Sequence, residues 1–198
     1  MQMRTQGVRA AATVLVAGLL VTGCTGDPAP VATTTQPSAT AAPTPSPTPT
    51  PTLDTTVPPE RPEAMATPSA EGAAAAASYF MQLYVYIYAT GDTTTWREMS
   101  AETCEFCADS ASDAEAVRAS GKRGGTAVEI VSAEGLELKQ GEWFTAALRV
   151  TQPPTIETDA TGQETQTSEG GTFDVDFAMT WADGWTVDSV GVEPAAGA

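Results

Sequence analysis

The three cysteines of this 198-residue chain are its most reactive side chains, and their spacing separates a single residue, Cys24, from a close pair. Cys24 follows Leu20-Val21-Thr22-Gly23, so a short apolar segment ends in small residues and a cysteine, which is the pattern of a bacterial lipobox. We predict that the chain is cut before Cys24 and that its thiol carries a diacylglycerol thioether, with palmitate as an acyl chain. The alternative is ordinary secretory cleavage that leaves Cys24 as a free thiol, which is unusual in an exported protein.

Residues 1–23 have the composition of a lipoprotein signal peptide. Arg4 and Arg9 precede the apolar run from Ala10 to Val21, which is shorter than the roughly 20 apolar residues that a transmembrane helix needs. Each buried acyl methylene contributes about 0.8 kcal/mol to membrane binding, so several acyl chains hold a protein on a bilayer for long periods. We therefore expect an exported protein, anchored in the cell envelope on the extracytoplasmic face of the membrane.

Cys104 and Cys107 form a Cys-Glu-Phe-Cys motif, and an even pair of thiols in an oxidising compartment favours a disulfide. A structural zinc site needs four ligands, whereas the chain has no histidine and only these two cysteines besides Cys24, so no metal is expected. Both a structural bridge and a redox pair remain open. The structural bridge is favoured, because the sequence pattern lacks the βαβ context of thioredoxin-like motifs.

The charge and composition of the chain exclude several classes of function. The formal net charge is −16, and removal of residues 1–23 takes away two arginines and no acid, which makes it −18. Nucleic acid is not an expected partner, because phosphate binding needs a basic face. The absence of histidine excludes Ser-His-Asp and Cys-His catalysis, and no glycine-rich loop has the spacing of a phosphate site. No cofactor is therefore expected.

The segment 24–66, which starts at the lipidated cysteine, is expected to be a disordered stalk. Residues 25–66 contain 11 prolines and 11 threonines and almost no large apolar side chain. Alternating prolines favour extended polyproline II at about 3.1 Å per residue, so the stalk can reach roughly 130 Å across a cell wall. It is either a bare spacer or a target for O-glycosylation. The remaining residues divide into a folded domain, 67–193, and a short tail, 194–198.

Helical spacing dominates the first half of the expected domain. Thr67-Pro68 is a favourable helix start and Gly91 a favourable stop, and the apolar residues between them recur with a helical period. Asp92 can cap a second, short helix that runs through Met99. A third helix is predicted from about Glu105 to Ser120.

Strand patterns follow the helical ones. Residues 144–151 alternate between apolar and polar or small side chains, and residues 172–181 alternate more clearly, so both are expected to be half-buried strands. The segment from Asp159 to Gly171, rich in threonine, glycine and acids, fits a mobile hairpin loop better than a calcium loop. Helices followed by about four antiparallel strands predict an α+β fold.

The connection between the last two strands determines their register. A three-residue turn at Ala182-Asp183-Gly184, with Gly184 left-handed, pairs Trp181 with Trp185 and Met179 with Val187 on one face. A two-residue turn places the two tryptophans on opposite faces instead. Beyond Val187 the apolar parity shifts, which predicts a bulge near Asp188-Ser189.

Three motifs and the order of the elements resemble a known family. The motifs are Val57-Pro58-Pro59-Glu60-Arg61-Pro62-Glu63-Ala64, Tyr88-Ala89-Thr90-Gly91-Asp92 and Cys104-Glu105-Phe106-Cys107. They are similar to an actinobacterial lipoprotein family, domain-of-unknown-function 6318, over roughly residues 57–193. The layout also resembles the nuclear-transport-factor-2-like cone, which implies about three helices packed on a curved antiparallel sheet of about four strands. The family itself supplies no activity.

The resemblance to the cone implies a pocket at its open end, where related folds bind apolar ligands. The aromatic residues that either line this pocket or belong to the core are Tyr84, Tyr88, Trp96, Phe106, Phe177, Trp181 and Trp185. Similarity to ketosteroid isomerase directs attention to a carboxylate base inside the pocket, for which Asp109 or Asp113 is the residual choice.

Three hypotheses about function result. The first is a non-enzymatic lipoprotein that presents its domain to an envelope protein or a cell-wall partner. The second is a lipoprotein that binds a small apolar ligand at the mouth of the cone, and the third is an isomerase-like enzyme. A mouth filled by tryptophans favours the first, whereas a wide apolar cavity with a buried carboxylate favours the others. The sequence does not predict an oligomeric state.

Overall fold

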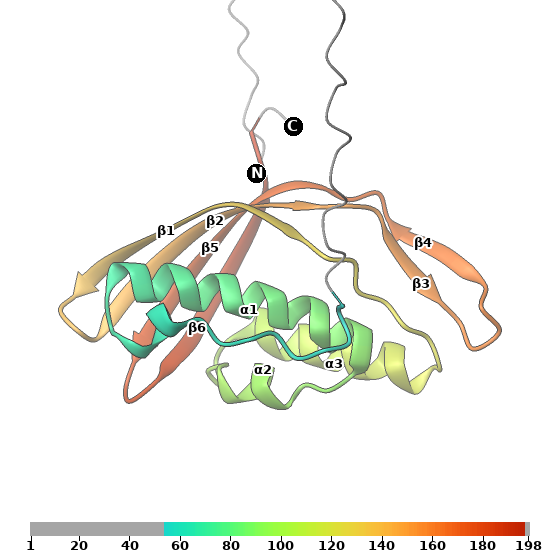
Figure 1. The fold of residues 1–198 in the computed structure, drawn as a ribbon, viewed down its shortest axis with the longest axis horizontal. Helices are drawn as coiled ribbons and strands as arrows, with labels where there is room; N and C mark the ends of the chain where they lie inside the picture. Colours follow the sequence, from blue (N-terminus) through green and yellow to red (C-terminus); the bar gives the residue numbers. More distant parts are fainter. Residues whose placement is uncertain (1–53, 197–198) are drawn as a thin grey trace, which may run out of the picture. The chain divides into compact units, whose positions relative to one another are not determined.

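The helices precede the strands in the order that the sequence predicts (Figure 1). The computed structural model describes residues 54–196. Its elements are the 3-10 helix η1 (Glu63–Ala66), the helices α1 (Ala70–Thr90), α2 (Thr94–Glu98) and α3 (Glu105–Ala119), and the strands β1 (Glu129–Lys139), β2 (Trp143–Gln152), β3 (Thr155–Thr158), β4 (Glu164–Ser168), β5 (Gly171–Trp181) and β6 (Trp185–Pro194). The predicted signal peptide, Cys24 and the stalk up to residue 53 lie outside the described residues.

Four of the strands form an antiparallel sheet in the order β1-β2-β5-β6, and β3 and β4 form a separate hairpin. Figure 1 shows the three α-helices on one face of the larger sheet and the β3–β4 hairpin extending beyond it. α1 packs mainly on β1 and β2, and α3 contacts both α1 and β6. The expected α+β class, with three helices on a four-stranded antiparallel sheet, is confirmed.

α1 starts slightly later than predicted. Ser69 caps its first turn, because Ser69 Oγ accepts a hydrogen bond from Gly72 N at 3.0 Å. The helix therefore begins at Ala70, and not at Thr67-Pro68. It ends, as predicted, at Gly91, which has a left-handed backbone with φ 75°.

The two shorter helices lie close to their predicted positions. Asp92 precedes α2, and its Oδ1 accepts a hydrogen bond from Thr94 N at 3.1 Å, which helps to cap that helix. α3 begins at Glu105 as predicted and ends at Ala119, just before the expected Ser120.

The inner face of the sheet carries the apolar half of each alternating strand. The buried residues are Phe144, Ala146, Leu148 and Val150 in β2, and Val175, Phe177 and Met179 in β5. Gly135 of β1 faces the same way, because it pairs with Ala146. A Cβ atom at Gly135 would lie 1.9 Å from Ala70 O, so only glycine allows α1 to pack this closely on β1.

The β5–β6 hairpin has the predicted register. Trp181 pairs with Trp185, and Met179 pairs with Val187. The pairing then skips Asp188, which is the extra residue of the predicted bulge.

The turn of this hairpin differs from the prediction in one detail. The left-handed residue is Asp183, with φ 61°, whereas Gly184 was expected. Aspartate tolerates this region because its short polar side chain can bond to nearby backbone groups. Ala182 N donates to Gly184 O at 3.1 Å within the turn.

The segment from Asp159 to Gly171, expected to be a loop, is partly a strand. Residues Glu164–Ser168 form β4 and pair with β3. Asp159 orders the turn between these strands, because its Oδ1 accepts hydrogen bonds from Thr161 N and Gln163 N at 2.8 and 2.9 Å. The side chains of β4 are polar and mostly exposed, so no apolar alternation marks this strand in the sequence.

The folded unit extends beyond residues 67–193 at both ends. Met65 of η1 is buried, and its carbonyl oxygen accepts a hydrogen bond from Trp185 Nε1 at 2.9 Å, so the end of the expected stalk packs on the domain. In the expected tail, Ala195 N donates to Thr172 O at 2.9 Å.

Candidate functional site

The predicted disulfide is present. Cys104 and Cys107 are bonded to each other, and each residue is only 1% exposed. Cys104 Sγ also accepts a hydrogen bond from Cys107 N at 3.3 Å and so caps the first turn of α3. Because both sulfurs are buried, a redox partner cannot reach them without local opening, which favours the structural role.

Trp96 of α2 is the centre of an aromatic cluster. Its ring stacks on Phe80 with the centroids 3.9 Å apart, and its Nε1 donates to Cys107 O at 2.8 Å. The rings of Tyr84 and Phe106 lie beside it, with centroids 6.0 and 6.3 Å away. Trp96 is 0% exposed, so α1, α2 and the disulfide end of α3 meet around one buried indole.

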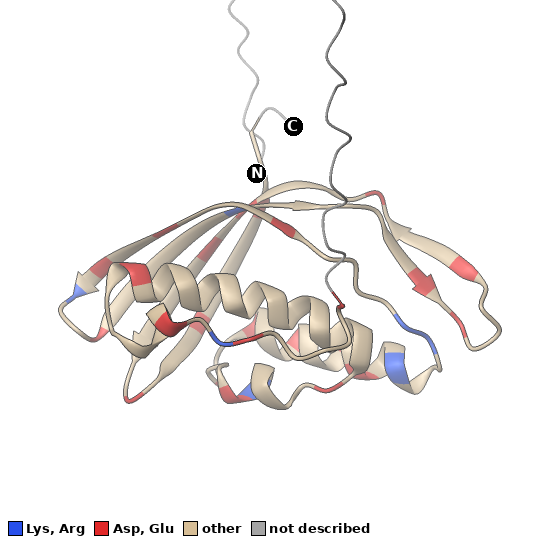
Figure 2. Cartoon of the chain, in the orientation of Figure 1, with Lys and Arg blue, Asp and Glu red and all other residues tan. Residues whose placement is uncertain are grey.

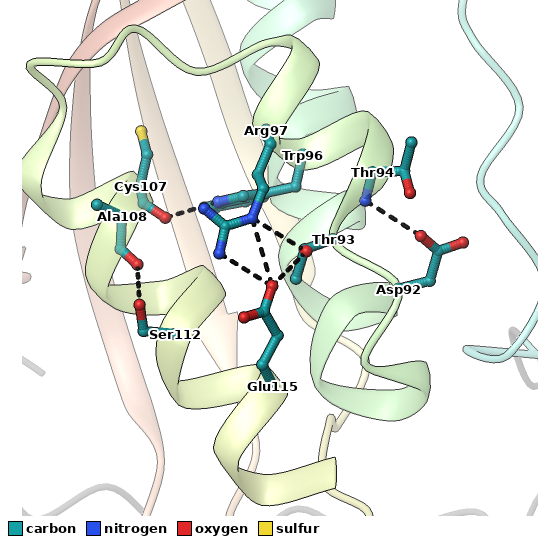
Figure 3. Close-up of polar contacts among 9 residues, drawn as sticks. All are labelled: Asp92, Thr93, Thr94, Trp96, Arg97, Cys107, Ala108, Ser112 and Glu115. Atoms are coloured by element: carbon teal, nitrogen blue, oxygen red, sulfur yellow. Dashed lines mark hydrogen bonds and ion pairs between the residues drawn. The ribbon is translucent and has the colours of Figure 1, made fainter. Parts of the chain in front are cut away.

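A polar network joins α2 and α3 on the outside of this cluster (Figure 3). Arg97 Nη2 lies 2.9 Å from Glu115 Oε1, and Thr93 Oγ1 donates to the same oxygen at 2.7 Å. The Thr93 hydroxyl and the Arg97 guanidinium lower the pKa of the Glu115 carboxyl below its ordinary value. Both side chains of the ion pair are about half exposed, so the network positions the helices and adds little stability.

The aromatic candidates do not all line one pocket. Trp96 and Phe177 belong to the core. Trp181 and Trp185 lie at the turn end of the β5–β6 hairpin, where their ring centroids are 5.2 Å apart and Phe144 packs against Trp185. The candidates predicted from the sequence therefore belong to two groups of aromatic rings, one around Trp96 and one around Trp185. The sequence alone does not show that these groups lie at different places along the sheet.

Tyr84 and Tyr88 line a pocket of about 290 Å³ between α1, residues 124–126 and the β3–β4 hairpin, here called the tyrosine pocket. Their ring centroids lie 5.0 Å apart. Burial raises the pKa of both phenols, and the nearby Tyr84 and Asp113 raise that of Tyr88 further, so both hydroxyls stay protonated at neutral pH. Most of the remaining lining side chains are polar, and they include Gln152, Thr155, Glu157, Thr167 and Ser168.

A second pocket, of about 450 Å³, lies between α1 and residues 54–60. Val85 and Tyr86 line it from the helix, and Val57 and Pro58 line it from the N-terminal segment. The Tyr86 hydroxyl donates to Asp92 Oδ2 at 3.1 Å. None of the aromatic residues proposed from the sequence lines this pocket.

The outer face of the sheet, opposite the helices, carries three large exposed apolar side chains. Leu136, Leu138 and Trp143 are 60, 58 and 57% exposed. Leu136 pairs with Thr145 across β1 and β2, and Leu138 lines the same shallow hollow as Trp143. We call Leu136, Leu138, Trp143 and Thr145 the outer apolar patch.

Sequence reasoning missed this patch, although one signal was available. Leu138 falls at an irregularity between Glu137 and Lys139, which interrupts the alternation of β1 and hides the strand. In β2, however, Trp143 directly precedes the buried Phe144. Because neighbouring residues in a strand point to opposite faces, that position places Trp143 outside the core.

Acidic side chains surround the outer apolar patch. Glu134 and Asp176 share a hollow with Leu136, and Asp188 shares one with Trp143. We call these three carboxylates the acidic rim. Figure 2 shows acidic residues distributed over the whole domain and few basic ones. The patch therefore combines an apolar centre with a mainly acidic border, in which Lys139, the cross-strand neighbour of Trp143, is paired with Glu142.

Asp109 and Asp113, the two carboxylates considered for acid–base chemistry, are solvent-accessible, as are two aspartates on the outer face of β5. Asp109 and Asp113 occupy exposed positions of α3. Asp174 lies opposite Arg149 on the sheet, with Arg149 Nε 2.8 Å from Asp174 Oδ1, and this arginine lowers the pKa of the aspartate. Asp176 is exposed on the same strand. None of these four aspartates lines the tyrosine pocket.

Residues 54–196 include no helix that is both long enough and apolar enough to cross a membrane. In that same part of the chain, no group of three or more acidic or cysteine side chains is arranged to hold a metal ion.

The model of the family of unknown function DUF6318 matches residues 54–191, which is well over half of the chain. This chain belongs to that family. The family predicted from the three motifs is thus confirmed, and the match covers the helices and almost all of the sheet of the DUF6318 domain. None of the curated proteins matches the sequence.

Solved structures share the fold of the DUF6318 domain. The crystal structure of the intermembrane space region of the chloroplast protein ARC6 aligns with a TM-score of 0.50 and 12% sequence identity. The alignment covers 64% of this chain and 98% of that chain. At such low identity the likeness concerns the fold alone.

Proposed function

We propose that this protein is an exported lipoprotein, held on the membrane of the cell envelope through lipid on Cys24, and that its DUF6318 domain is a non-enzymatic interaction module. The lipobox at Leu20 to Cys24 and the proline- and threonine-rich segment after it support the anchor and the stalk. A nuclear-transport-factor-2-like cone is part of the proposal, supported by helices that precede a sheet of order β1-β2-β5-β6.

The packing between the helices and the sheet supports an interaction module over a cone that holds an apolar ligand. Phe80 stacks on Trp96 and meets Phe177 edge-on, with ring centroids 6.2 Å apart. All three residues are at most 2% exposed. These rings occupy the space between the layers at the density of a protein core, where an apolar ligand would otherwise lie.

The observation that carries the proposal is the outer apolar patch. Leu136, Leu138 and Trp143 expose more than half of their surface on the sheet face that the helices leave open. Contiguous exposed apolar surface with a polar border marks interaction sites on soluble domains. Tryptophan is also the residue type most enriched among side chains that dominate binding energy.

The acidic rim determines the kind of partner. A protein surface with an apolar centre and lysine or arginine around it would complement both parts of this face. A second copy of the chain would bring the acidic residues Glu134, Asp176 and Asp188 of both copies together, in a molecule whose net charge of −16 becomes −18 when residues 1–23 are removed. Anionic headgroups of a bilayer would be repelled for the same reason.

Capture from an envelope extract tests the patch with two matched variants of the full chain. Trp143→Ser removes the largest side chain of the patch, and Val57→Ser removes an apolar side chain that is 58% exposed but lies on the N-terminal segment. We expect a protein that wild type and Val57→Ser retain, that Trp143→Ser loses, and that high salt releases because screening weakens the charge pairing. Equal retention by both variants, or equal loss, contradicts the proposal.

The anchor has a separate test. Cys24→Ser removes the thiol that would carry the lipid, so the protein should appear in the medium instead of the membrane fraction. Continued membrane association of this variant would refute the lipid anchor and leave the interaction module untouched.

A further inference from the structure

The walls of the tyrosine pocket are held together by backbone contacts. Arg123 N donates to Thr158 O at 2.9 Å and Thr158 N donates to Arg123 O at 2.9 Å, which joins the segment after α3 to the β3–β4 hairpin. The backbone of Gly125 is in close contact with α1, because a Cβ atom there would lie 2.8 Å from Val85 O. Gly124 N also donates to Tyr88 O at 3.2 Å. The pocket is thus part of the fold and not a gap between loose segments.

Hydroxyl and amide groups predominate on the hairpin side of the pocket. Gln152 Nε2 donates to Thr155 Oγ1 at 2.7 Å, and Thr167 and Ser168 add two further hydroxyls. The carboxylate of Glu157 is balanced by the ammonium group of Lys122, whose Nζ lies 3.0 Å from Glu157 Oε2. This wall therefore offers many hydrogen-bond donors and acceptors with little net charge.

The helix side of the pocket offers aromatic rings. Tyr84 and Tyr88 are tilted by 55° to each other, and both phenols are protonated and can donate as well as accept hydrogen bonds. An aromatic body with a polar tip suits a ligand that is apolar on one face and polar at its edges.

We infer that the tyrosine pocket binds a small uncharged carbohydrate, a mono- or disaccharide. A sugar ring presents C–H groups on its faces and hydroxyls at its rim, which matches tyrosine rings on one wall and hydroxyl and amide groups on the other. The volume of about 290 Å³ lies near the lower end of the ~300–1,000 Å³ typical of small-molecule pockets, so the ligand is small. The acidity of the domain disfavours anionic sugars.

Titration of the full chain in detergent with glucose, mannose, N-acetylglucosamine and maltose, followed by NMR chemical shifts, tests this inference. Uncharged hexan-1-ol serves as the apolar probe. We expect at least one sugar to bind saturably and to shift the resonances of residues in the tyrosine pocket, while hexan-1-ol shifts none of them. Shifts in that pocket from hexan-1-ol alone, or from no probe, would overturn the inference.

Gly124→Val fills the pocket and has a matched control. A Cβ atom at Gly124 would meet only Glu157 Cγ at 3.8 Å and Tyr88 O at 4.0 Å, so the branch point of the new side chain meets no clash. At Gly191, on β6, an added Cβ meets nothing within 4 Å. Gly124→Val should weaken sugar binding at least tenfold and Gly191→Val should leave it unchanged. Equal affinities of the two variants would contradict the assignment to this pocket.

Removal of a tyrosine hydroxyl tests the same site, because a Tyr→Phe substitution deletes only one oxygen atom. Tyr88→Phe should weaken binding by roughly threefold to tenfold, the worth of one hydrogen bond. Tyr86→Phe is the control, because this neighbour on α1 lines the other pocket and its hydroxyl bonds to Asp92. An equal loss in both variants would overturn the inference. The outer apolar patch lies elsewhere, so either result leaves the proposed protein partner unaffected.

Discussion

Gly135→Ala is the substitution for which the packing of the domain makes its sharpest prediction. Gly135 lies on the inner face of β1, at the point where the first turn of α1 crosses the sheet. The added methyl carbon would lie 1.9 Å from Ala70 O and 3.1 Å from Ala74 N. Both atoms belong to the helix backbone, so no side chain can rotate away to make room.

The loss of stability follows from the short distance between the added methyl carbon and Ala70 O. Non-bonded heavy atoms attract at about 3.5–4 Å, so α1 must move by more than about 1 Å relative to β1. Overpacking of a core typically costs about 1–3 kcal/mol. Because the obstacle is backbone, we expect about 3 kcal/mol, which lowers the melting temperature of a domain of this size by about 10 °C.

Thermal and urea unfolding of the full chain, followed by circular dichroism, measures this effect. Gly191→Ala is the control, because a Cβ atom there meets nothing within 4 Å and should change stability by no more than about 0.5 kcal/mol. Wild-type stability of Gly135→Ala, or an equal loss in Gly191→Ala, would refute the close packing of α1 on β1.

Three further predictions concern the α2–α3 region. The buried disulfide should resist reduction by dithiothreitol in the native state, and rapid thiol labelling of the dithiothreitol-treated native protein would contradict this resistance. Replacing Cys104 and Cys107 by Ser should cost about 2 kcal/mol of unfolding free energy. Trp96→Phe should cost about 2 kcal/mol in urea unfolding, because it removes a hydrogen bond and leaves a cavity, and an unchanged midpoint would count against the cluster. The pKa of Glu115 is depressed in the folded state, so its contribution to stability is present above the unfolded pKa and is lost as pH falls through the folded value. Thr93→Val should raise this pKa in an NMR titration, and no change would exclude the hydrogen bond.

The sequence predicts best those parts of the fold in which the cap and turn residues and the pattern of buried residues indicate the same structure. Gly91 ends α1, and strict alternation in β5 with a short turn pairs Trp181 with Trp185. Where burial is weak, the pattern is lost. β1 is mostly exposed and interrupted by bulges, and its contact with α1 depends on Gly135, which contributes no apolar signal.

The candidate site was predictable only in part. The Cys104–Cys107 bridge follows from cysteine parity and spacing, because a pair three residues apart can bond locally. Tyr84 and Tyr88 lie one helical turn apart, so their common face was also accessible to sequence reasoning. The hydroxyl-bearing wall opposite these tyrosines was not predictable from the sequence. It is contributed by the β3–β4 hairpin, whose polar side chains resemble those of a loop.

Site-specific photo-cross-linking in intact cells tests the central claim, an interaction surface on the outer face of the sheet, most directly. A photoreactive amino acid would replace Thr145 in the patch, which leaves Trp143 in place, or, as the control, the exposed Glu98 at the end of α2. We expect an adduct with another envelope protein from position 145, lost when Asp176→Lys reverses a charge of the acidic rim, and no such adduct from position 98. An adduct only from position 98, or one from position 145 that contains a second copy of this chain, would contradict the proposed interaction surface.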